Sequence, residues 1–430
     1  MKKYYNRLIE PYLKLLMHEF PAIAIDGLKG VGKTVSTKRL ANTVFELDKP
    51  RDFDQLSNIP DILSSEMPPI LIDEWQRIPA VWDYVRRAVD DGINSGTFLL
   101  TGSIANSDMN IHSGAARIIR RKMYPLSLAE RDIEKPTVSI GEIFSGSKSF
   151  ETHITGKTDV TTVQYISEIV ISGLPEFRKL SSENRKIALE SYFENTLSHE
   201  FKQQGISLRQ PKTLLRWLRA YAAAVSTDAG YNEILDASTA GEGHKPAAKT
   251  TIAYREALEN LWILDELAPW FDGEDYFSGL KRSPKHYLTD PAFSAYLLGL
   301  DEKVMLGADN WSSRAERFDV KYGSIIGRLF ESLVHLSLNT YVTVNNAKLS
   351  FLKTQKGNHE IDFIIQKDSK IVAAEVKFSP TVAPSDGKHL RWLIENVGKD
   401  CIDAIIISTG GVAYRRSDGI AVVPAALLGA

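Results

Sequence analysis

A phosphate-binding pattern lies near the start of the chain, where GLKGVGKT matches G-x-x-x-x-G-K-[ST] at every fixed position. The eight residues are Gly27, Leu28, Lys29, Gly30, Val31, Gly32, Lys33 and Thr34. Glycines permit positive φ angles, so backbone N–H groups can point inward around nucleotide phosphates. Lys33 would neutralise phosphate charge, and the Thr34 hydroxyl would take one Mg²⁺ position. The pattern predicts a bound purine nucleoside triphosphate, ATP above all, with Mg²⁺. A chance glycine turn is the alternative interpretation.

An acid pair at the end of a second apolar run supplies the other half of such a site. The run PILID ends in Asp73, and Glu74 follows it. In phosphoryl-transfer sites one carboxylate holds Mg²⁺, and a second polarises the water that attacks the γ-phosphate. We therefore expect Thr34 and Asp73 at the metal and Glu74 at the water. An ordinary acidic strand end is the alternative.

Hydroxyl and basic side chains further along are additional candidates for this site. A third apolar run ends in Thr101 and Ser103, at the sheet edge where open α/β folds bind ligands. Either hydroxyl would sense the γ-phosphate or position water, unless both belong to a simple turn. A basic cluster follows, made of Arg117, Arg120, Arg121 and Lys122. One of these cations would act as an arginine finger in its own or a neighbouring subunit. A solvated face or a patch facing nucleic acid is the alternative.

These residues need a scaffold, and the pattern from residue 20 to about 130 predicts one. Strands are expected at Ala22–Asp26, Pro69–Asp73 and Thr97–Thr101. Helices are expected over Thr34–Phe45 and Pro79–Gly92. Alternation of strand and helix predicts an α/β fold with a parallel sheet. We assign residues 1–131 to a P-loop NTPase domain.

Three stretches resemble a family of prokaryotic AAA-type ATPases whose members carry a C-terminal domain of unknown function. The stretches are ILIDEWQRIP, LLTGS and HSGAARIIRRKMYPLSLAE. The residues at the family's motif positions are Gly27–Thr34, Asp73, Glu74, Gln76, Thr101–Ser103, Arg117 and Pro125–Glu130. Ala115 and Ala116 depart from the family, in which a Gly-Arg pair is commoner, so the choice of arginine stays open. The resemblance implies ATP binding and hydrolysis, with Lys33, Glu74, Thr101, Ser103 and Arg117 as candidate catalytic residues.

The rest of the chain divides into three parts by composition and pattern. Residues 132–162 are rich in Ser, Thr, Gly and Lys and are expected to form a linker. Residues 163–318 are expected to be helical and winged-helix-like, with a helix at Ala248–Leu261 and a strand at Trp262–Leu267. Residues 319–430 are expected to form a mixed α/β, restriction-endonuclease-like domain. Its predicted elements are a helix at Gly323–Leu338 and strands at Leu349–Thr354, Glu360–Ile365, Ile371–Phe378 and Asp403–Ser408.

A second set of charged residues lies in this last part. Glu375 and Lys377 are two apart on a strand and share a face. Asp362 on the preceding strand and Glu331 on the helix would complete a carboxylate cluster able to hold Mg²⁺. The set resembles the PD-(D/E)xK nuclease fold, including archaeal junction resolvases. The interpretations left open are an active nuclease or end-binding domain, the same fold without activity, and charges that merely solvate a strand.

Charge and hydropathy restrict the partners. The formal net charge of −2 argues against a wholly basic surface but allows a local patch. His244, Lys245, Lys249 and Arg255 lie on or before the helix at Ala248–Leu261. They would contact the phosphates of DNA or RNA, or simply form a solubilising face. No apolar run reaches the roughly 18 residues of a membrane span, so a cytoplasmic protein is expected.

Two functions from different classes fit these observations. The first is an ATPase whose C-terminal half engages nucleic acid and includes a nuclease. The second is a nucleotide-gated regulatory protein without nuclease activity, in which ATP is a conformational ligand and the C-terminal half binds a protein. The oligomeric state stays open.

Overall fold

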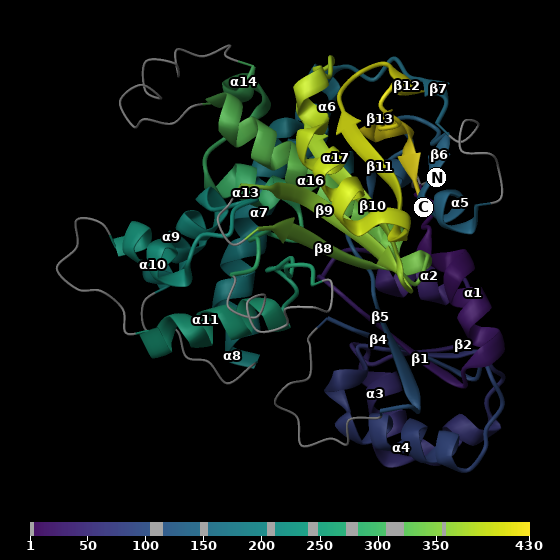
Figure 1. The fold of residues 1–430 in the computed structure, drawn as a ribbon. Coiled ribbons are helices and arrows are strands. Elements are labelled where there is room, and N and C mark those ends of the chain that lie inside the picture. The colour runs from purple at the N-terminus through teal and green to yellow at the C-terminus, as the bar shows by residue number, and fades with distance from the viewer. Residues whose placement is uncertain are drawn as a thin grey trace.

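The computed structural model describes residues 4–103, 115–146, 154–203, 211–239, 248–271, 283–306, 322–354 and 358–430. Figure 1 shows an N-terminal sheet, in purple and blue, at one end of the molecule. A second sheet, in green and yellow, lies at the other end, with a group of teal helices beside both. These three parts correspond to the predicted α/β, helical and mixed α/β regions.

The N-terminal sheet is five-stranded and entirely parallel, in the order β2-β3-β4-β1-β5. Its strands are β1 (Ala22–Asp26), β2 (Thr43–Glu46), β3 (Ile70–Asp73), β4 (Phe98–Gly102) and β5 (Ile118–Lys122). The helices of this part are α1 (Ile9–Glu19), α2 (Lys33–Lys38), α3 (Pro50–Asn58) and α4 (Pro79–Asp90). Because all strands run the same way, the residues that follow β1, β3 and β4 meet at one edge of the sheet.

Alternate residues of β1 belong to two different hydrophobic cores, as strand geometry requires. Ala22 and Ala24 pack in a core with α3 and α4. Ile23 and Ile25 pack in a core that α1 shares with helices from the middle of the chain. The N-terminal sheet is therefore covered on one face by its own helices and on the other partly by the middle region.

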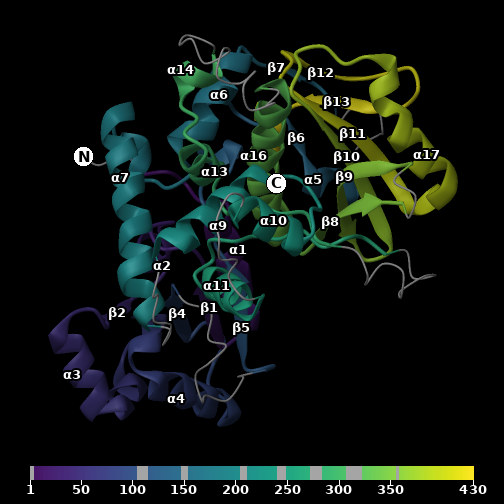
Figure 2. The ribbon, with the colours of Figure 1, turned by 90° about the vertical axis from the view of Figure 1, so that its left-hand side faces the viewer.

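The middle region is helical. Its helices are α6 (Thr162–Ile171), α7 (Ser182–Asn195), α8 (Phe201–Gln203), α9 (Pro211–Ala223), α10 (Tyr231–Thr239), α11 (Ala248–Asn260), α13 (Pro291–Leu297) and α14 (Glu302–Met305). A short π-helix at Thr196–Glu200 continues α7. Figure 2 shows α7 running from beside α13 toward the N-terminal sheet and α2. The predicted strand at Trp262–Leu267 forms only isolated antiparallel bridges, Leu264 to Leu288 and Leu267 to Lys285. The winged-helix interpretation stays a prediction.

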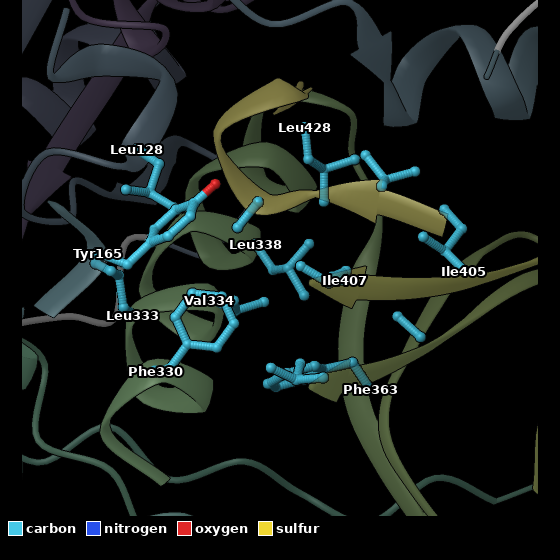
Figure 3. Packing of buried hydrophobic residues seen from close by; sticks show 14 of the residues in the cluster. Leu128, Tyr165, Phe330, Leu333, Val334, Leu338, Phe363, Ile405, Ile407 and Leu428 are labelled. Carbon is cyan, nitrogen blue, oxygen red and sulfur yellow. The ribbon is translucent and has the colours of Figure 1, made fainter. Parts of the chain in front are cut away.

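The C-terminal sheet is mixed, in the order β7-β12-β13-β11-β10-β9-β8. Its strands are β7 (Gly156–Lys157), β8 (Lys348–Lys353), β9 (Glu360–Lys367), β10 (Lys370–Lys377), β11 (Cys401–Ser408), β12 (Val412–Arg415) and β13 (Ala421–Pro424). Helices α16 (Tyr322–Val344) and α17 (Lys388–Val397) pack on opposite faces. Figure 3 shows Phe330, Val334 and Leu338 of α16 facing Phe363, Ile405 and Ile407 of the strands.

Two sequence-based boundaries differ from the structure. The helix expected over Thr34–Phe45 ends at Lys38, and Thr43–Glu46 is an added strand, β2, which pairs with β3. Residues expected to form a linker contain β6 (Val138–Ser139), α5 (Ile140–Ser145) and β7. β7 joins the C-terminal sheet, and β6 pairs with β14 (Leu428–Gly429). Both pairings are long-range, so the local composition of residues 132–162 did not reveal them.

Candidate functional site

The glycine-rich loop follows β1 and leads into α2. Gly27 has a φ of 144°, and a Cβ there would lie 2.3 Å from the carbonyl oxygen of Met123, so only glycine fits. Lys33 is buried, and its Nζ donates to the carbonyl oxygens of Gly27 at 2.7 Å and Leu28 at 3.1 Å. Burial lowers the pKa of Lys33 to about 8, against the opposing effect of Glu74 and other nearby carboxylates. The loop thus holds a buried cation against its own backbone.

The predicted metal-binding residues lie together at the carboxyl edge of the sheet. The Thr34 hydroxyl donates to Asp73 Oδ1 at 2.7 Å, and the Thr101 hydroxyl donates to the same oxygen. Burial raises the pKa of Asp73, and these two hydroxyls partly offset the shift. Asp26, at the end of β1, is buried, and its Oδ1 has no hydrogen-bond partner among the described residues. Oxygen ligands of this kind fit Mg²⁺.

Glu74 lies beside this group in an unusual backbone conformation. Its φ of 55° and ψ of 43° are left-handed, a conformation that a non-glycine residue adopts at some cost and that concentrates at functional sites. The Ser103 hydroxyl donates to Glu74 Oε1 at 2.9 Å, and the Gln76 amide donates to Oε2. The structure therefore brings Lys33, Thr34, Asp73, Glu74, Thr101 and Ser103 to one edge of the sheet.

The basic cluster is divided among different partners. Arg120 Nε lies 2.7 Å from Asp26 Oδ2, next to the loop. Arg121 donates to the Tyr12 hydroxyl, and Lys122 pairs with Asp265. These contacts leave Arg120 as the cation of the cluster that is paired with a carboxylate at the P-loop edge.

Arg117, one of the expected catalytic residues, lies away from the P-loop of its own chain. Its Nε pairs with Asp90 Oδ1 at 2.8 Å on the exposed surface of α4. Ala22 pairs with Ile118 and Asp26 with Lys122 in the parallel register, so Arg117 precedes the amino end of β5. The P-loop follows the carboxyl end of β1, about 13 Å away at the rise of a strand. Within one chain, the structure does not bring Arg117 to the P-loop.

The ion pair between Arg7 and Glu130, which we call the brace, contacts the backbone of the P-loop. The sequence did not predict it. Arg7 donates to the carbonyl oxygens of Val31 and Tyr124, each at 2.6 Å, and to Glu130 Oε1 at 3.1 Å. Glu130 Oε2 in turn accepts hydrogen bonds from the backbone N–H and the hydroxyl of Ser127, both at 2.9 Å. The Pro125–Glu130 motif thus forms a capping box that orients Arg7 against the P-loop. Only the 123-residue separation between Arg7 and Glu130 hid this contact.

The middle helices also touch the P-loop. Lys29 Nζ lies 2.6 Å from Glu200 Oε1, and the Tyr192 hydroxyl donates to the Lys29 carbonyl at 3.4 Å. Leu174 packs in the same buried hydrophobic cluster as Leu28 and Val31 of the P-loop. The segment from residue 174 to residue 200 therefore contacts the P-loop directly, through Leu174, Tyr192 and Glu200.

The predicted nuclease-like residues also converge, but around a residue that the sequence analysis missed. Lys285 Nζ lies 3.2 Å from Glu331 Oε1, 3.2 Å from Glu360 Oε1 and 3.1 Å from Asp362 Oδ1. Burial alone would lower the pKa of Lys285, but Glu331 and Asp362 raise it well above its ordinary value. Lys285 lies outside the predicted nuclease-like domain, and its neighbours in the sequence do not indicate that it belongs to a site.

The remaining members of this cluster lie on β10. Glu375 is buried, and its Oε1 has no hydrogen-bond partner among the described residues. Burial and then the Asp362 charge raise the pKa of Glu375 well above its ordinary value. Lys377 Nζ lies 3.7 Å from Glu375 Oε2. The four predicted residues are thus neighbours, as the strand and helix pattern indicated.

The two carboxylate sites differ in their fit to a divalent cation. At the P-loop edge, hydroxyl and carboxylate oxygens converge without an intervening cation, and these residues fit Mg²⁺. In the C-terminal cluster, an ammonium group already occupies the centre of the carboxylates. That second arrangement does not fit a divalent cation. Across the described parts of the chain, no group of three or more His, Cys, Asp or Glu side chains is arranged to hold a metal ion.

The basic residues predicted to contact nucleic acid are only partly described. Arg255 pairs with Glu259 at 3.2 Å, and its guanidinium lies 4.4 Å from the centre of the Tyr231 ring. Its charge is thus engaged within the fold. His244 and Lys245, and the side chain of Lys249, lie outside the described residues.

Comparison with known proteins divides the chain as the structure does. Residues 19–131 match the model of the AAA domain. Residues 162–304 match a domain of unknown function (DUF8612), and residues 326–428 match another (DUF4143). The chain therefore combines an AAA-type P-loop ATPase domain with a C-terminal domain of unknown function, as the sequence predicted.

Individual relatives are distant. Uncharacterized proteins of Mycobacterium bovis and Mycobacterium tuberculosis are each 24% identical over 421 residues, which cover 96% of this chain and 82% of theirs. Among solved structures, the Walker-type ATPase paby2304 of Pyrococcus abyssi is 13% identical, with a TM-score of 0.39. The match covers 68% of this chain and 96% of that one. A likeness of this size supports no statement about shared function.

Within the described ranges, no helix has both the length and the apolar character to cross a membrane.

Proposed function

We propose that this chain binds ATP with Mg²⁺ at the P-loop that begins at Gly27 and hydrolyses the bound nucleotide. The proposal rests chiefly on one observation. Lys33, Thr34 and Asp73 meet at the edge of the sheet where Glu74 is held by a hydroxyl donor. A phosphate-binding lysine, a pair of metal-binding oxygens and a carboxylate base are the groups that this reaction needs. The match to the AAA domain supports the same reading.

Each residue of the nucleotide site has a distinct role in the proposed reaction. The loop N–H groups and Lys33 bind the phosphates, and Thr34 and Asp73 hold Mg²⁺. The metal ion supplies positive charge that neutralises the phosphate oxygens as the bond to the leaving group breaks. Glu74 accepts a proton from water while the water oxygen bonds to the γ-phosphorus, releasing ADP and inorganic phosphate. Ser103 and Gln76 hold the Glu74 carboxylate through hydrogen bonds.

The test is Mg²⁺-dependent phosphate release from ATP. Lys33→Ala should abolish ATP binding, whereas Glu74→Gln should bind ATP and lose turnover by at least about 100-fold. Lys38→Ala is the matched control, because Lys38 lies on the same helix and pairs with Glu46 at the surface. If wild-type protein binds ATP but releases no phosphate, the proposed hydrolysis is wrong and only the proposed ATP binding stands. Equal turnover in wild type and Glu74→Gln would remove Glu74 from the mechanism.

A nucleotide-gated switch is the second candidate. The observation that favours it is the direct contact of the P-loop with the middle helices through Lys29, Glu200 and Tyr192. Limited proteolysis with and without a non-hydrolysable ATP analogue tests this role. A changed cleavage pattern in residues 163–318 is expected, and an unchanged pattern would count against gating.

Engagement of nucleic acid stays a prediction. A gel-shift series with DNA and RNA across salt concentrations tests it, since phosphate contacts weaken steeply as salt rises. Binding that does not change with salt, or no binding, would favour a protein partner for the C-terminal half. The geometry around Lys285 does not support nuclease activity.

A further inference from the structure

The buried ammonium of Lys285 lies where a nuclease-like cluster would hold a metal ion. We propose that Lys285 is a tethered cation that replaces the divalent metal, so that the C-terminal module binds no divalent cation while Lys285 is in place. This inference goes beyond ATP binding and concerns a different end of the molecule. Under this proposal the cluster offers no metal ion for the hydrolysis of a phosphodiester bond.

The coordination of the ammonium group is the first argument. A lysine ammonium donates three hydrogen bonds. Lys285 Nζ donates hydrogen bonds to Asp362 Oδ1 at 3.1 Å and Glu331 Oε1 at 3.2 Å, and it forms an ion pair with Glu360 Oε1 at 3.2 Å. One oxygen of each of these three carboxylates is therefore already engaged by the ammonium group. A divalent cation beside them would also meet a positive charge at close range, which is unfavourable.

Burial is the second argument. The Lys285 side chain is only 1% exposed, and those of Glu331 and Asp362 are 13% and 15% exposed. Carboxylates so far from water need a compensating cation, and a buried ion pair that loses one partner is strongly destabilised. Lys285 provides that cation from within the chain. Its Nζ also lies over the Phe351 ring, 5.6 Å from the ring centre.

The backbone around Lys285 fixes it in this position. The N–H and the carbonyl oxygen of Lys285 are both hydrogen-bonded to Leu267, each at 2.9 Å. Two residues further on, the Tyr287 hydroxyl donates to the same Glu331 oxygen at 2.6 Å. Asp362 is oriented by the Val376 N–H, which donates to its second oxygen at 2.9 Å. Glu331 and Asp362 are thus each held by a second donor besides Lys285, as expected for a preformed site.

The Glu375 carboxylate indicates how the cluster would behave if the ammonium group of Lys285 were removed. Glu375 is buried on β10, and its Oε1 has no partner among the described residues. With the ammonium removed, Glu331, Asp362 and Glu375 would present unpaired carboxylate oxygens to one space. Such a set is the usual ligand type for Mg²⁺ or Mn²⁺. The cluster is therefore a cation site that the ammonium group of Lys285 occupies.

The experiment measures Mn²⁺ binding to the full chain without nucleotide, by electron paramagnetic resonance of free Mn²⁺. Wild type should show no site that depends on Asp362. Lys285→Met keeps the length of the stem and removes the charge, and it should gain one Mn²⁺ site at least about ten times tighter than any in wild type. Lys353→Met is the matched control, because Lys353 also pairs with Glu360 but is 29% exposed. It should gain no site.

The outcomes separate the alternatives. A wild-type Mn²⁺ site that disappears in Asp362→Asn would overturn the proposal, as would Asp362-dependent cleavage of DNA or RNA. A folded Lys285→Met protein that gains no site would overturn it as well. If Lys285→Met is too unstable to titrate, its melting temperature decides: Mn²⁺ should raise it in Lys285→Met and leave that of wild type unchanged. Equal responses of the two proteins would contradict the proposal. ATP turnover at the P-loop is independent of all these results.

Discussion

Arg7→Met is the variant that tests the brace beneath the P-loop. The Arg7 and Glu130 side chains are 3% and 1% exposed, so their ion pair is buried. Removing one partner of a buried pair costs about 3–5 kcal/mol, because the remaining charge is left without compensation. Glu130 keeps its hydrogen bonds from Ser127 and from the Leu8 N–H, which favours the lower end of that range.

The expected loss for Arg7→Met is thus about 3 kcal/mol of unfolding free energy, measured by urea denaturation. The Val31 carbonyl also loses its donor, so ATP affinity should fall by up to about tenfold, measured by calorimetry. Lys179→Met is the control, because Lys179 pairs with Glu176 at the surface and such pairs contribute less than about 1 kcal/mol.

A double-mutant cycle with Glu130→Gln isolates the interaction between the two side chains. The double variant should be less destabilised than the sum of the single variants, by about 1–3 kcal/mol. Additive effects, or a loss below about 1 kcal/mol for Arg7→Met, would refute the role assigned to the brace.

Three further predictions concern the nucleotide site. Gly27→Ala should lose more than about 2 kcal/mol of unfolding free energy in urea, because the new Cβ would meet the Met123 carbonyl. Gly92→Ala, where the φ is also positive but nothing lies within 4 Å, should lose only about 1 kcal/mol. Burial lowers the pKa of Lys33 to about 8, so the charge that binds phosphate is lost as pH rises through that value. ATP affinity by calorimetry should fall between about pH 7 and pH 9.5, and a constant affinity would contradict the lowered pKa. Arg117→Ala should leave ATP turnover unchanged within about twofold, whereas Arg120→Ala, which unpairs Asp26, should reduce it about tenfold or more. The reverse order in a phosphate-release assay would restore Arg117 to the site.

The nucleotide site was predictable because its signals are local. The P-loop, its flanking strand and the acid pair after β3 each occupy a few consecutive residues. Parallel pairing then brings the ends of β1, β3 and β4 together without further information. The helix that was expected to run to Phe45 shows the limit of this reasoning. Its second half became β2 through pairing with β3, and a tertiary contact overrode the local pattern.

The residues that sequence reasoning missed are those whose roles depend on distant partners. Arg7 and Glu130 are 123 positions apart, and Lys285 lies 77 positions from Asp362. Lysine and arginine in helical or irregular segments are ordinary solubilising residues, so nothing local distinguishes a buried one. Arg117 is the opposite case. A motif position suggested a catalytic role, but the register of β5 against β1 places it beyond the wrong end of the strand.

A single turn after α6 connects the P-loop side of the molecule with the segment that carries Lys285. Leu174, in this turn, packs in the same buried hydrophobic cluster as Leu28 and Val31 of the P-loop. Two residues earlier, the Ser172 hydroxyl and the Gly173 N–H donate to Asp290 Oδ2 at 2.7 and 2.8 Å. Asp290 also caps α13, five residues after Lys285, through a 3.0 Å hydrogen bond to the Ala292 N–H. Because these contacts are buried, movement of the turn would disturb apolar packing on the P-loop side and hydrogen bonds on the Asp290 side. The P-loop and the segment that carries Lys285 are therefore joined through one buried turn, and these contacts would resist a movement of either side relative to the other.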